Sequence, residues 1–142
     1  MAHSKIKIWV HAILGTKNHY PLIKSSYQDQ IYALIKDEIA KTKCVLNIMN
    51  GTADHVHLLF LLHPDKSIRE VMHQIKGGSS YQINRAGIFK QKFHWQIGSG
   101  AFSVSESGIS NLKNYIHNQQ EHHKKMTFEQ EYQKFLKLYG LV

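Results

Sequence analysis

The sequence predicts an α+β fold in which helices pack on an antiparallel sheet. Short apolar segments typical of strands occur between longer segments whose apolar residues recur every three or four positions, as in helices. The predicted order is strand, helix, strand, strand, helix, strand, helix, helix. Because no repeat, low-complexity tract or Pro/Gly linker divides the chain, we expect a single domain over residues 1–142.

The first half of the chain is predicted to form a strand, an amphipathic helix and a hairpin. Residues 6–14 alternate loosely between polar and apolar, and residues 27–40 have apolar side chains at helical spacing. Residues 45–49 and 55–62 are apolar runs, and the second is expected to be an inner strand covered on both faces. Turn-forming residues 50–53 would connect these two strands as a hairpin.

The next segment is predicted to be a helix followed by a strand. Ser67 is a good N-cap, and Glu70 three residues later completes a capping-box pattern. Residues 77–80, Gly-Gly-Ser-Ser, are expected to interrupt this helix as a kink or as a close approach to a ligand. Residues 94–104 are expected to be a strand pair or one bent strand, with a bulge marked by glycines.

Two helices are predicted to end the chain. The first starts at Ser107 or Ser110 and continues to about His122. The second is capped by Thr127 and packs aromatic residues at helical spacing.

The composition favours nucleic acid as a partner. The chain has 18 Lys and Arg residues against 10 Asp and Glu residues, which gives a net charge of +8 at pH 7. A positive field attracts polyanions, so an anionic membrane surface is the alternative partner. No predicted helix combines a strongly basic face with a wide apolar one, and we therefore expect no membrane partner.

The sequence also bears on the cellular compartment. Cys44 is the single cysteine, so an intrachain disulfide is excluded and a reducing cytoplasm is expected. We identify neither a signal peptide nor a transmembrane segment, and we expect a cytoplasmic protein.

Two histidines mark the first candidate site. His55 and His57 are two residues apart on a predicted strand, so their side chains lie on one face while Val56 and Leu58 point to the core. Two neighbouring imidazoles can share a divalent ion. With 11 histidines in the chain, one such pair is expected by chance, and two ordinary histidines at a sheet surface are the alternative.

A tyrosine and a glutamine mark the second candidate site. Tyr115 and Gln119 are four residues apart on a predicted helix and therefore lie one turn apart on the same face. An amide oxygen can complete a metal site, and a phenol beside it could attack a metal-bound phosphate. The alternative is a tyrosine that packs at the edge of the core and a glutamine that faces water.

Taken together, these two motifs resemble those of a known family of DNA transposases. The segment Asp-His-Val-His-Leu-Leu at residues 54–59, combined with Tyr115, Gln119 and the Glu-His-His at 121–123, resembles the HUH-type single-tyrosine transposases of the smallest bacterial insertion sequences. The likeness extends over nearly the whole chain. It implies a ferredoxin/RRM-like HUH nuclease fold with C-terminal helices that carry the tyrosine.

The resemblance implies a metal-dependent transposase that cleaves and rejoins single-stranded DNA through a 5′-phosphotyrosine intermediate. Tyr115 would be the nucleophile, and His55, His57 and Gln119 would bind Mg²⁺ or Mn²⁺. Mixed nitrogen and oxygen ligands suit Mn²⁺ somewhat better. The covalent link would conserve the energy of the phosphodiester bond, so rejoining needs no ATP, which agrees with the lack of an ATP-binding phosphate loop motif in the sequence.

The sequence leaves open the roles of three residues near these motifs. Asp54 is the only acid expected beside the histidines, where it would either orient one of them or form part of a turn. His122 could replace or supplement Gln119, and His123 is less well placed.

The resemblance also implies the partners. We expect single-stranded DNA hairpins at the element ends, and a homodimer whose tyrosine helix can complete the partner's site, in a bacterial or archaeal cytoplasm near the nucleoid. The DNA-binding candidates are cationic side chains: Lys76, Arg85, Lys90 and Lys92, with Lys5, Lys7 and Lys17 as weaker ones.

Two other functions are kept as alternatives. The first is a domesticated, repeat-associated single-strand endonuclease that uses the same residues. The second is a non-catalytic nucleic-acid-binding module, in which the histidines and the tyrosine are incidental. This second alternative predicts that Tyr115→Phe leaves activity unchanged.

Overall fold

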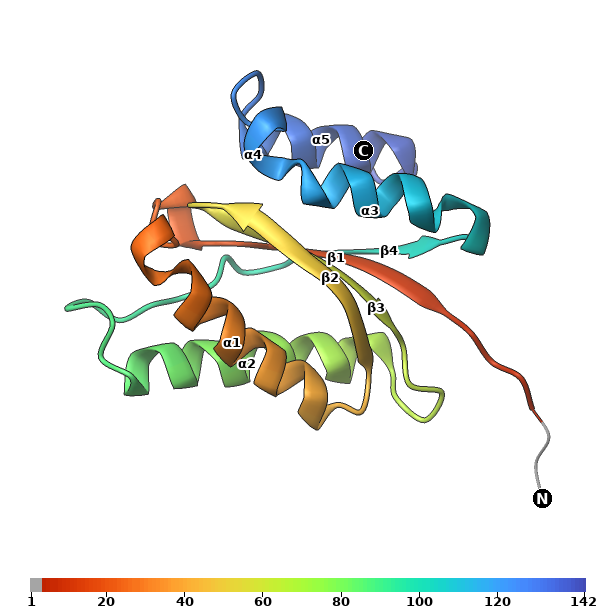
Figure 1. Ribbon diagram of the computed structural model, residues 1–142, viewed down its shortest axis with the longest axis horizontal. Coiled ribbons are helices and arrows are strands. Elements are labelled where there is room, and N and C mark those ends of the chain that lie inside the picture. The colour runs from red at the N-terminus through yellow and green to blue at the C-terminus, as the bar shows by residue number, and fades with distance from the viewer. Residues whose placement is uncertain (1–3) are drawn as a thin grey trace.

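The computed structural model describes residues 4–142 and contains a four-stranded antiparallel sheet with helices on both faces (Figure 1). Across the sheet the strands lie in the order β2-β3-β1-β4. The strands are β1 (Trp9–Gly15), β2 (Val45–Thr52), β3 (His55–Leu61) and β4 (Gly100–Val104). The α-helices are α1 (Ser25–Lys41), α2 (Ile68–Arg85), α3 (Ile109–His117), α4 (Gln119–His122) and α5 (Phe128–Leu138). Two short 3-10 helices cover Lys17–His19 and Glu106–Gly108. The predicted α+β class is confirmed.

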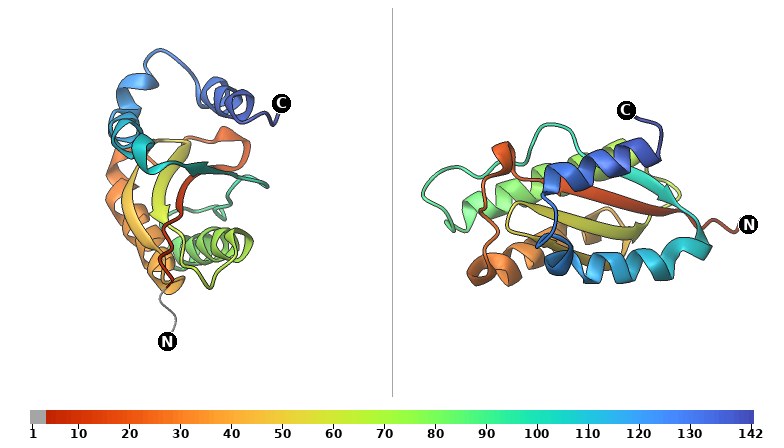
Figure 2. Two further views of the ribbon diagram at one scale, coloured as in Figure 1. Left: turned by 90° about the vertical axis from the view of Figure 1, so that its right-hand side faces the viewer. Right: turned by 90° about the horizontal axis from the view of Figure 1, so that it is seen from above.

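The helices form two separate layers. Helices α1 and α2 lie against one face of the sheet, and α3, α4 and α5 lie over the other (Figures 1 and 2). Side chains alternate along each strand, so Val56, Leu58 and Phe60 of β3 join the core beneath α1 and α2. His55 and His57 point to the opposite face, as the two-residue spacing predicted. Within residues 4–142, no helix has both the length and the apolar character needed to cross a bilayer.

The β2–β3 hairpin is present, but its turn lies later than predicted. Strand β2 continues through Thr52, and the turn is formed by residues 53 and 54. Gly51 pairs with Val56 inside the ladder instead of forming the turn. A Cβ atom at Gly51 would lie 2.0 Å from the carbonyl oxygen of His55, so glycine is required there by close backbone approach.

Strand β1 begins later than the predicted residues 6–14. Trp9 pairs with Leu61 of β3 and with Val104 of β4, the last residues of these two strands. Residues 4–8 therefore lie outside both ladders, although the carbonyl oxygen of Ile8 still accepts from the Leu62 amide, and Ile6 and Ile8 are exposed.

Helix α2 is continuous through the glycines predicted to interrupt it. It begins with the predicted capping box, in which Ser67 and Glu70 bond each other's backbone amides. A Cβ atom at Gly78 would lie 1.8 Å from the Oε1 atom of Glu38 on α1, whereas one at Gly77 would meet nothing within 4 Å. The close approach predicted at these glycines is therefore to helix α1 and not to a ligand.

Residues 94–104 form one short strand and an isolated bridge, in place of the predicted strand pair or single bent strand. Only residues 100–104 belong to β4, and Trp95 makes a single isolated bridge to Thr16. Between them Gly98 has a φ of 80°, and the Lys76 ammonium group donates to the carbonyl oxygens of Gln96 and Gly98. The Lys76 side chain thus supplies these two loop carbonyl oxygens with the hydrogen bonds that a neighbouring strand would otherwise provide.

Candidate active site

A cluster of buried polar side chains lies between the sheet and helices α3, α4 and α5. It is drawn from four elements: His11 of β1, His55 and His57 of β3, Gln119 of α4 and Glu131 of α5. Each of these residues is at most 1% exposed. A buried polar group costs free energy unless it is hydrogen-bonded. The hydrogen bonds within the cluster therefore offset the cost of burying these side chains.

His55 is held at both ring nitrogens. Nδ1 lies 2.8 Å from the Oδ1 atom of Asp54, and Nε2 lies 2.7 Å from the Oε1 atom of Gln119. The ring stacks on Phe128 with centroids 4.2 Å apart. Burial alone would lower the pKa of His55, but its hydrogen bonds to Asp54, Glu131 and Gln119 outweigh burial and raise this pKa to about 9. Asp54 thus contacts a histidine, one of its two expected roles.

His57 is held by a second histidine and by a carboxylate. Its Nδ1 atom lies 2.8 Å from Nε2 of His11, and its Nε2 atom lies 2.9 Å from Oε1 of Glu131. Burial lowers the pKa of His57, and burial together with the charge of His57 lowers the pKa of His11 to about 3. Without a metal, Nε2 of His57 donates to Glu131; if Nε2 binds a metal instead, neutral His11 can accept the hydrogen bond from Nδ1–H of His57.

Glu131 lies at the centre of the cluster. Its Oε1 atom is 2.9 Å from His57 Nε2, 3.3 Å from His55 Nε2 and 3.1 Å from His123 Nε2. Burial raises the pKa of this carboxyl, but hydrogen bonds from the three histidines outweigh burial and hold the pKa well below its usual range. The expectation that Asp54 is the only acid beside the histidines is therefore wrong, because α5 folds back over the sheet and brings in Glu131 (Figure 2).

Tyr115 projects from α3 toward the same carboxylate. Its hydroxyl donates to Oε2 of Glu131, and its ring stacks on His122 with centroids 4.4 Å apart. Burial, followed by the contact with Glu131, raises the pKa of Tyr115 above its ordinary value. The phenol is therefore protonated at neutral pH, and its hydroxyl is fixed at the edge of the histidine cluster.

Gln119 reaches the cluster although the predicted helix is broken before it. The helix that was expected to continue to His122 ends at His117, and Asn118 has φ −97° and ψ 24°. At this break the side-chain amide of Asn50 on β2 donates to the carbonyl oxygens of Ile116 and His117, each at 3.0 Å. The Nε2 atom of Gln119 then donates to Oε2 of Glu131 at 2.9 Å.

The donor atoms suit a divalent cation. One ligand atom from each of His55, His57 and Glu131 can be chosen so that all lie within 4.8 Å of one another. The amide oxygen of Gln119 adjoins this group through its contact with His55. Two imidazoles with carboxylate and amide oxygens form a mixed set that fits Mn²⁺ or Mg²⁺. His122 does not join the set, because its ring stacks on Tyr115 and its buried Nε2 atom has no hydrogen-bond partner among the described residues.

The sequence matches one protein family over most of its length. The matching family model is described as "Transposase IS200 like" and covers residues 4–119. The chain belongs to this family. The match includes His55, His57, Tyr115 and Gln119, and it ends before α5.

Two solved structures share the fold of this IS200-like transposase. A candidate transposase from Deinococcus radiodurans R1 is 23% identical with a TM-score of 0.69, over 84% of this chain and 95% of that one. A REP-associated tyrosine transposase bound to a REP hairpin is 14% identical with a TM-score of 0.66, over 87% of this chain and 74% of that one. At these identities the likeness establishes the fold. A search of curated proteins gives no match.

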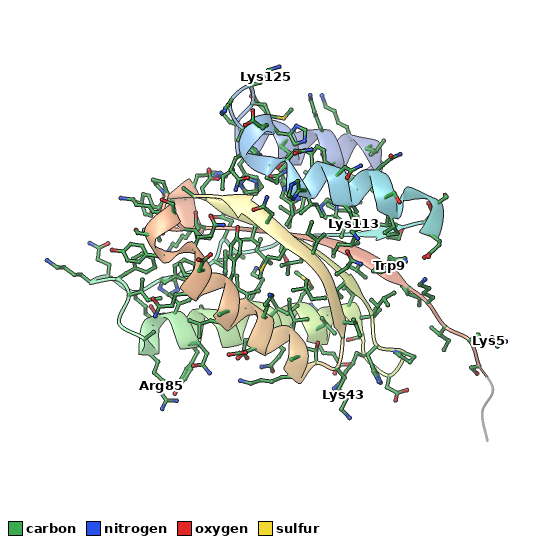
Figure 3. All side chains as sticks on the ribbon, in the orientation of Figure 1. Lys5, Trp9, Lys43, Arg85, Lys113 and Lys125 are labelled. Carbon is green, nitrogen blue, oxygen red and sulfur yellow. The ribbon has the colours of Figure 1, made fainter. Side chains whose placement is uncertain are left out.

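The four cationic residues predicted to bind DNA differ in their surroundings in the transposase. Lys90 and Lys92 are exposed in the segment between α2 and β4, and Arg85 is exposed at the end of α2 (Figure 3). Lys76 is half-buried, and burial lowers its pKa. Since its ammonium group already bonds two loop carbonyls, Lys76 holds the loop that carries Gly98.

Glu131 and His11 were not predicted as members of the site, and each has a sequence signal. Glu131 follows Phe128 by three residues and precedes Phe135 by four, so it lies on the apolar face of its helix, where a carboxylate requires a buried partner. His11 lies on the same strand face as Trp9 and Ile13, which are buried. The strand register that brings His11 to His57 is not readable from the sequence.

Proposed function

We propose that this protein cleaves and rejoins single-stranded DNA through a covalent 5′-phosphotyrosine on Tyr115. One observation carries the proposal: in a chain of the IS200-like transposase family, the Tyr115 hydroxyl and the His55, His57 and Gln119 side chains converge on one buried carboxylate. A tyrosine held beside a cluster of metal-ligand type is the arrangement that phosphoryl transfer by a phenol requires.

The proposed step balances without an energy source. The phenol of Tyr115 loses its proton, and its oxygen attacks the scissile phosphorus. The bond from phosphorus to the 3′ oxygen breaks, and that oxygen takes up a proton to become a free 3′-hydroxyl. One phosphodiester is exchanged for another, so attack of a 3′-hydroxyl on the phosphotyrosine rejoins DNA by the reverse reaction.

The raised pKa of Tyr115 means that the proton must leave during the step. A divalent cation bound by His55, His57 and Gln119 would supply Lewis-acid stabilisation of charge that develops on the phosphate. Asp54 and His11 would act by positioning, since each bonds the Nδ1 atom of one of the two histidines and so directs Nε2 toward the cluster.

The proposed substrate is a DNA strand that folds into a hairpin. Support comes from the net charge of +8 and from the exposed Lys90 and Lys92. The fold neighbour described above is a transposase bound to a REP hairpin. Tyr115 and His57 of the same chain lie with ring centroids 6.0 Å apart, which supports a site formed within one chain; the homodimer stays a prediction.

The test uses oligonucleotides labelled at the 3′ end, which carry the hairpins that flank the gene. Because tyrosine would hold the 5′-phosphate, the labelled fragment stays on the protein and migrates as an adduct in a denaturing gel. Wild type is compared with Tyr115→Phe in Mn²⁺, Mg²⁺ and EDTA. The control is Tyr81→Phe, which alters an exposed phenol on α2.

We expect a metal-dependent adduct with wild type and Tyr81→Phe, and none with Tyr115→Phe. An adduct that persists in Tyr115→Phe would contradict the role of this tyrosine. Absence of any adduct from hairpins that wild type binds tightly would favour the non-catalytic binding module instead.

A further inference from the structure

Glu131 is the one carboxylate that contacts both histidines of the candidate metal centre among the described residues. It belongs to α5, which lies beyond residue 119, where the family match ends. Within the described residues, the segment that the family model matches supplies two imidazoles and an amide, whereas the carboxylate in direct contact with both imidazoles lies on a helix beyond that segment.

Helix α5 is built to hold this carboxylate in place. Its first turn is fixed by a capping box between Thr127 and Gln130. Phe128, one turn before Glu131, stacks on His55, and Phe135, one turn after it, packs against His57 and Tyr115. The aromatic contacts on both sides seat Glu131 over the histidines, so its position follows from the packing of the whole helix.

The charge of the donor set points to a ligand role. Neutral imidazoles and an amide carry no net charge, whereas Mg²⁺ and Mn²⁺ favour anionic oxygen ligands. The Oε1 atom of Glu131 faces His55 and His57, and its Oε2 atom faces Gln119 and Tyr115. One carboxylate thus touches every residue of the proposed catalytic centre.

We propose that Glu131 is the anionic oxygen ligand of the metal centre in the DNA-free protein, and that it positions the Tyr115 phenol beside the ion. The proposal rests on the metal centre of the proposed function. It makes α5 part of that centre, although this helix lies outside the segment that the family model matches. A phosphate oxygen is the same type of donor as a carboxylate oxygen, so a DNA strand can compete for the position of Glu131.

The test measures metal binding in the DNA-free protein, with no dependence on activity. Mn²⁺ binding is followed by calorimetry and by the rise in Tm that Mn²⁺ causes over EDTA, since a ligand that binds the folded state raises its stability. The variants are Glu131→Gln, which keeps the shape and removes the charge, and Glu131→Asp, which keeps the charge. Glu129→Gln changes an exposed carboxylate on the same helix and is the matched control. Circular dichroism in EDTA checks that each variant is folded.

We expect Glu131→Gln to weaken Mn²⁺ binding by about tenfold to a hundredfold or more, with partial recovery in Glu131→Asp and none of this loss in Glu129→Gln. A folded Glu131→Gln variant that binds Mn²⁺ as tightly as wild type would overturn the proposal. Glu131 would then serve only to accept hydrogen bonds within the cluster.

A fourth variant, His57→Ala, separates this result from failure of the proposed function. Loss of binding in His57→Ala with retention in Glu131→Gln would refute only the role of Glu131. Mn²⁺ binding that is absent in wild type, or unchanged in His57→Ala, would refute the metal centre itself, and the role of Glu131 with it.

Discussion

The two faces of the sheet are made from the same strands, yet they bury opposite kinds of side chain. Beneath α1 and α2, strand β3 contributes Val56, Leu58 and Phe60 to an apolar core. Toward α3, α4 and α5, the alternate residues of the same strand include His55 and His57, which are equally buried. Apolar burial stabilises a fold directly, whereas buried polar groups must first recover the cost of their desolvation through hydrogen bonds.

We infer that the α1/α2 face supplies most of the stability, whereas the opposite face carries the candidate site. The polar face is not free of apolar packing, because Trp9, Leu59 and Ile116 form one small cluster and Ile13, Phe102 and Phe128 another. These clusters fasten α3 and α5 to the sheet on either side of the histidines. Substitutions on the two faces should therefore separate stability from activity.

The largest difference between the effect on activity and the effect on stability is expected on the polar face, at the proposed nucleophile. Tyr115→Phe should reduce adduct formation by roughly three orders of magnitude or more, the scale seen when a nucleophile is removed. Its free energy of unfolding should fall by no more than about 1.5–3 kcal/mol, the contribution of one hydrogen bond to a charged group. Urea denaturation and the adduct assay measure the two effects on the same preparation.

The opposite result is expected on the apolar face. Phe60→Ala removes a fully buried ring and should lower the free energy of unfolding by about 3–5 kcal/mol. Adduct formed per folded molecule should stay near that of wild type, since Phe60 points away from the histidines. A Phe60→Ala protein of full stability, or one folded but inactive, would refute the division between the two faces.

The pH dependence of stability should reflect the polar face when metal is removed by EDTA. The pKa values of His11 and His57 are lowered by burial, so the unfolded chain binds more protons and stability rises as the pH increases toward about 6.5. The pKa of His55 is raised to about 9, so its contribution is complete below 6.5 and is lost as the pH rises through 9.

We therefore expect a maximum in Tm near pH 6.5 in EDTA, with a loss of no more than about 3 kcal/mol by pH 9 from His55. Thermal melts at a series of pH values measure this curve. The decline above pH 6.5 should disappear in His55→Gln. A wild-type Tm that is constant from pH 6.5 to 9 would show that His55 is not held in its charged form.

The smallest effects are expected at two neighbouring glycines of α2, on the apolar side. Gly78→Ala places a Cβ atom against buried Glu38 and should destabilise the protein by about 1–3 kcal/mol through overpacking. Gly77→Ala meets open space and should stabilise it by up to about 1 kcal/mol through helix propensity. Equal effects of the two substitutions in urea denaturation would refute the close packing of α1 on α2.

Much of the architecture was predictable because it depends on local patterns. The hairpin between β2 and β3, the caps at Ser67 and Thr127, and the shared face of His55 and His57 all follow from spacing and side-chain chemistry. The errors at strand and helix ends have non-local causes. Within residues 94–104, where a strand pair or one bent strand was predicted, Lys76 from α2 bonds two loop carbonyl oxygens.

The candidate site was predictable only in part. Tyr115, His55, His57 and Gln119 were selected by a motif, and the structure brings all four to one carboxylate. That carboxylate, Glu131, was missed because nothing in the sequence states over which part of the sheet α5 lies. His123 reaches the cluster for the same reason, through the turn that leads to α5.

The most direct test of the central claim is to locate the DNA attachment by mass spectrometry. The adduct is digested with nuclease, which leaves a short nucleotide on the protein, and then with trypsin. Cleavage after Lys113 and Lys124 releases residues 114–124, a peptide whose single tyrosine is Tyr115. A nucleotide mass on Tyr115 of this peptide is the predicted result. Attachment to another tyrosine, such as Tyr132 or Tyr139, would contradict the account.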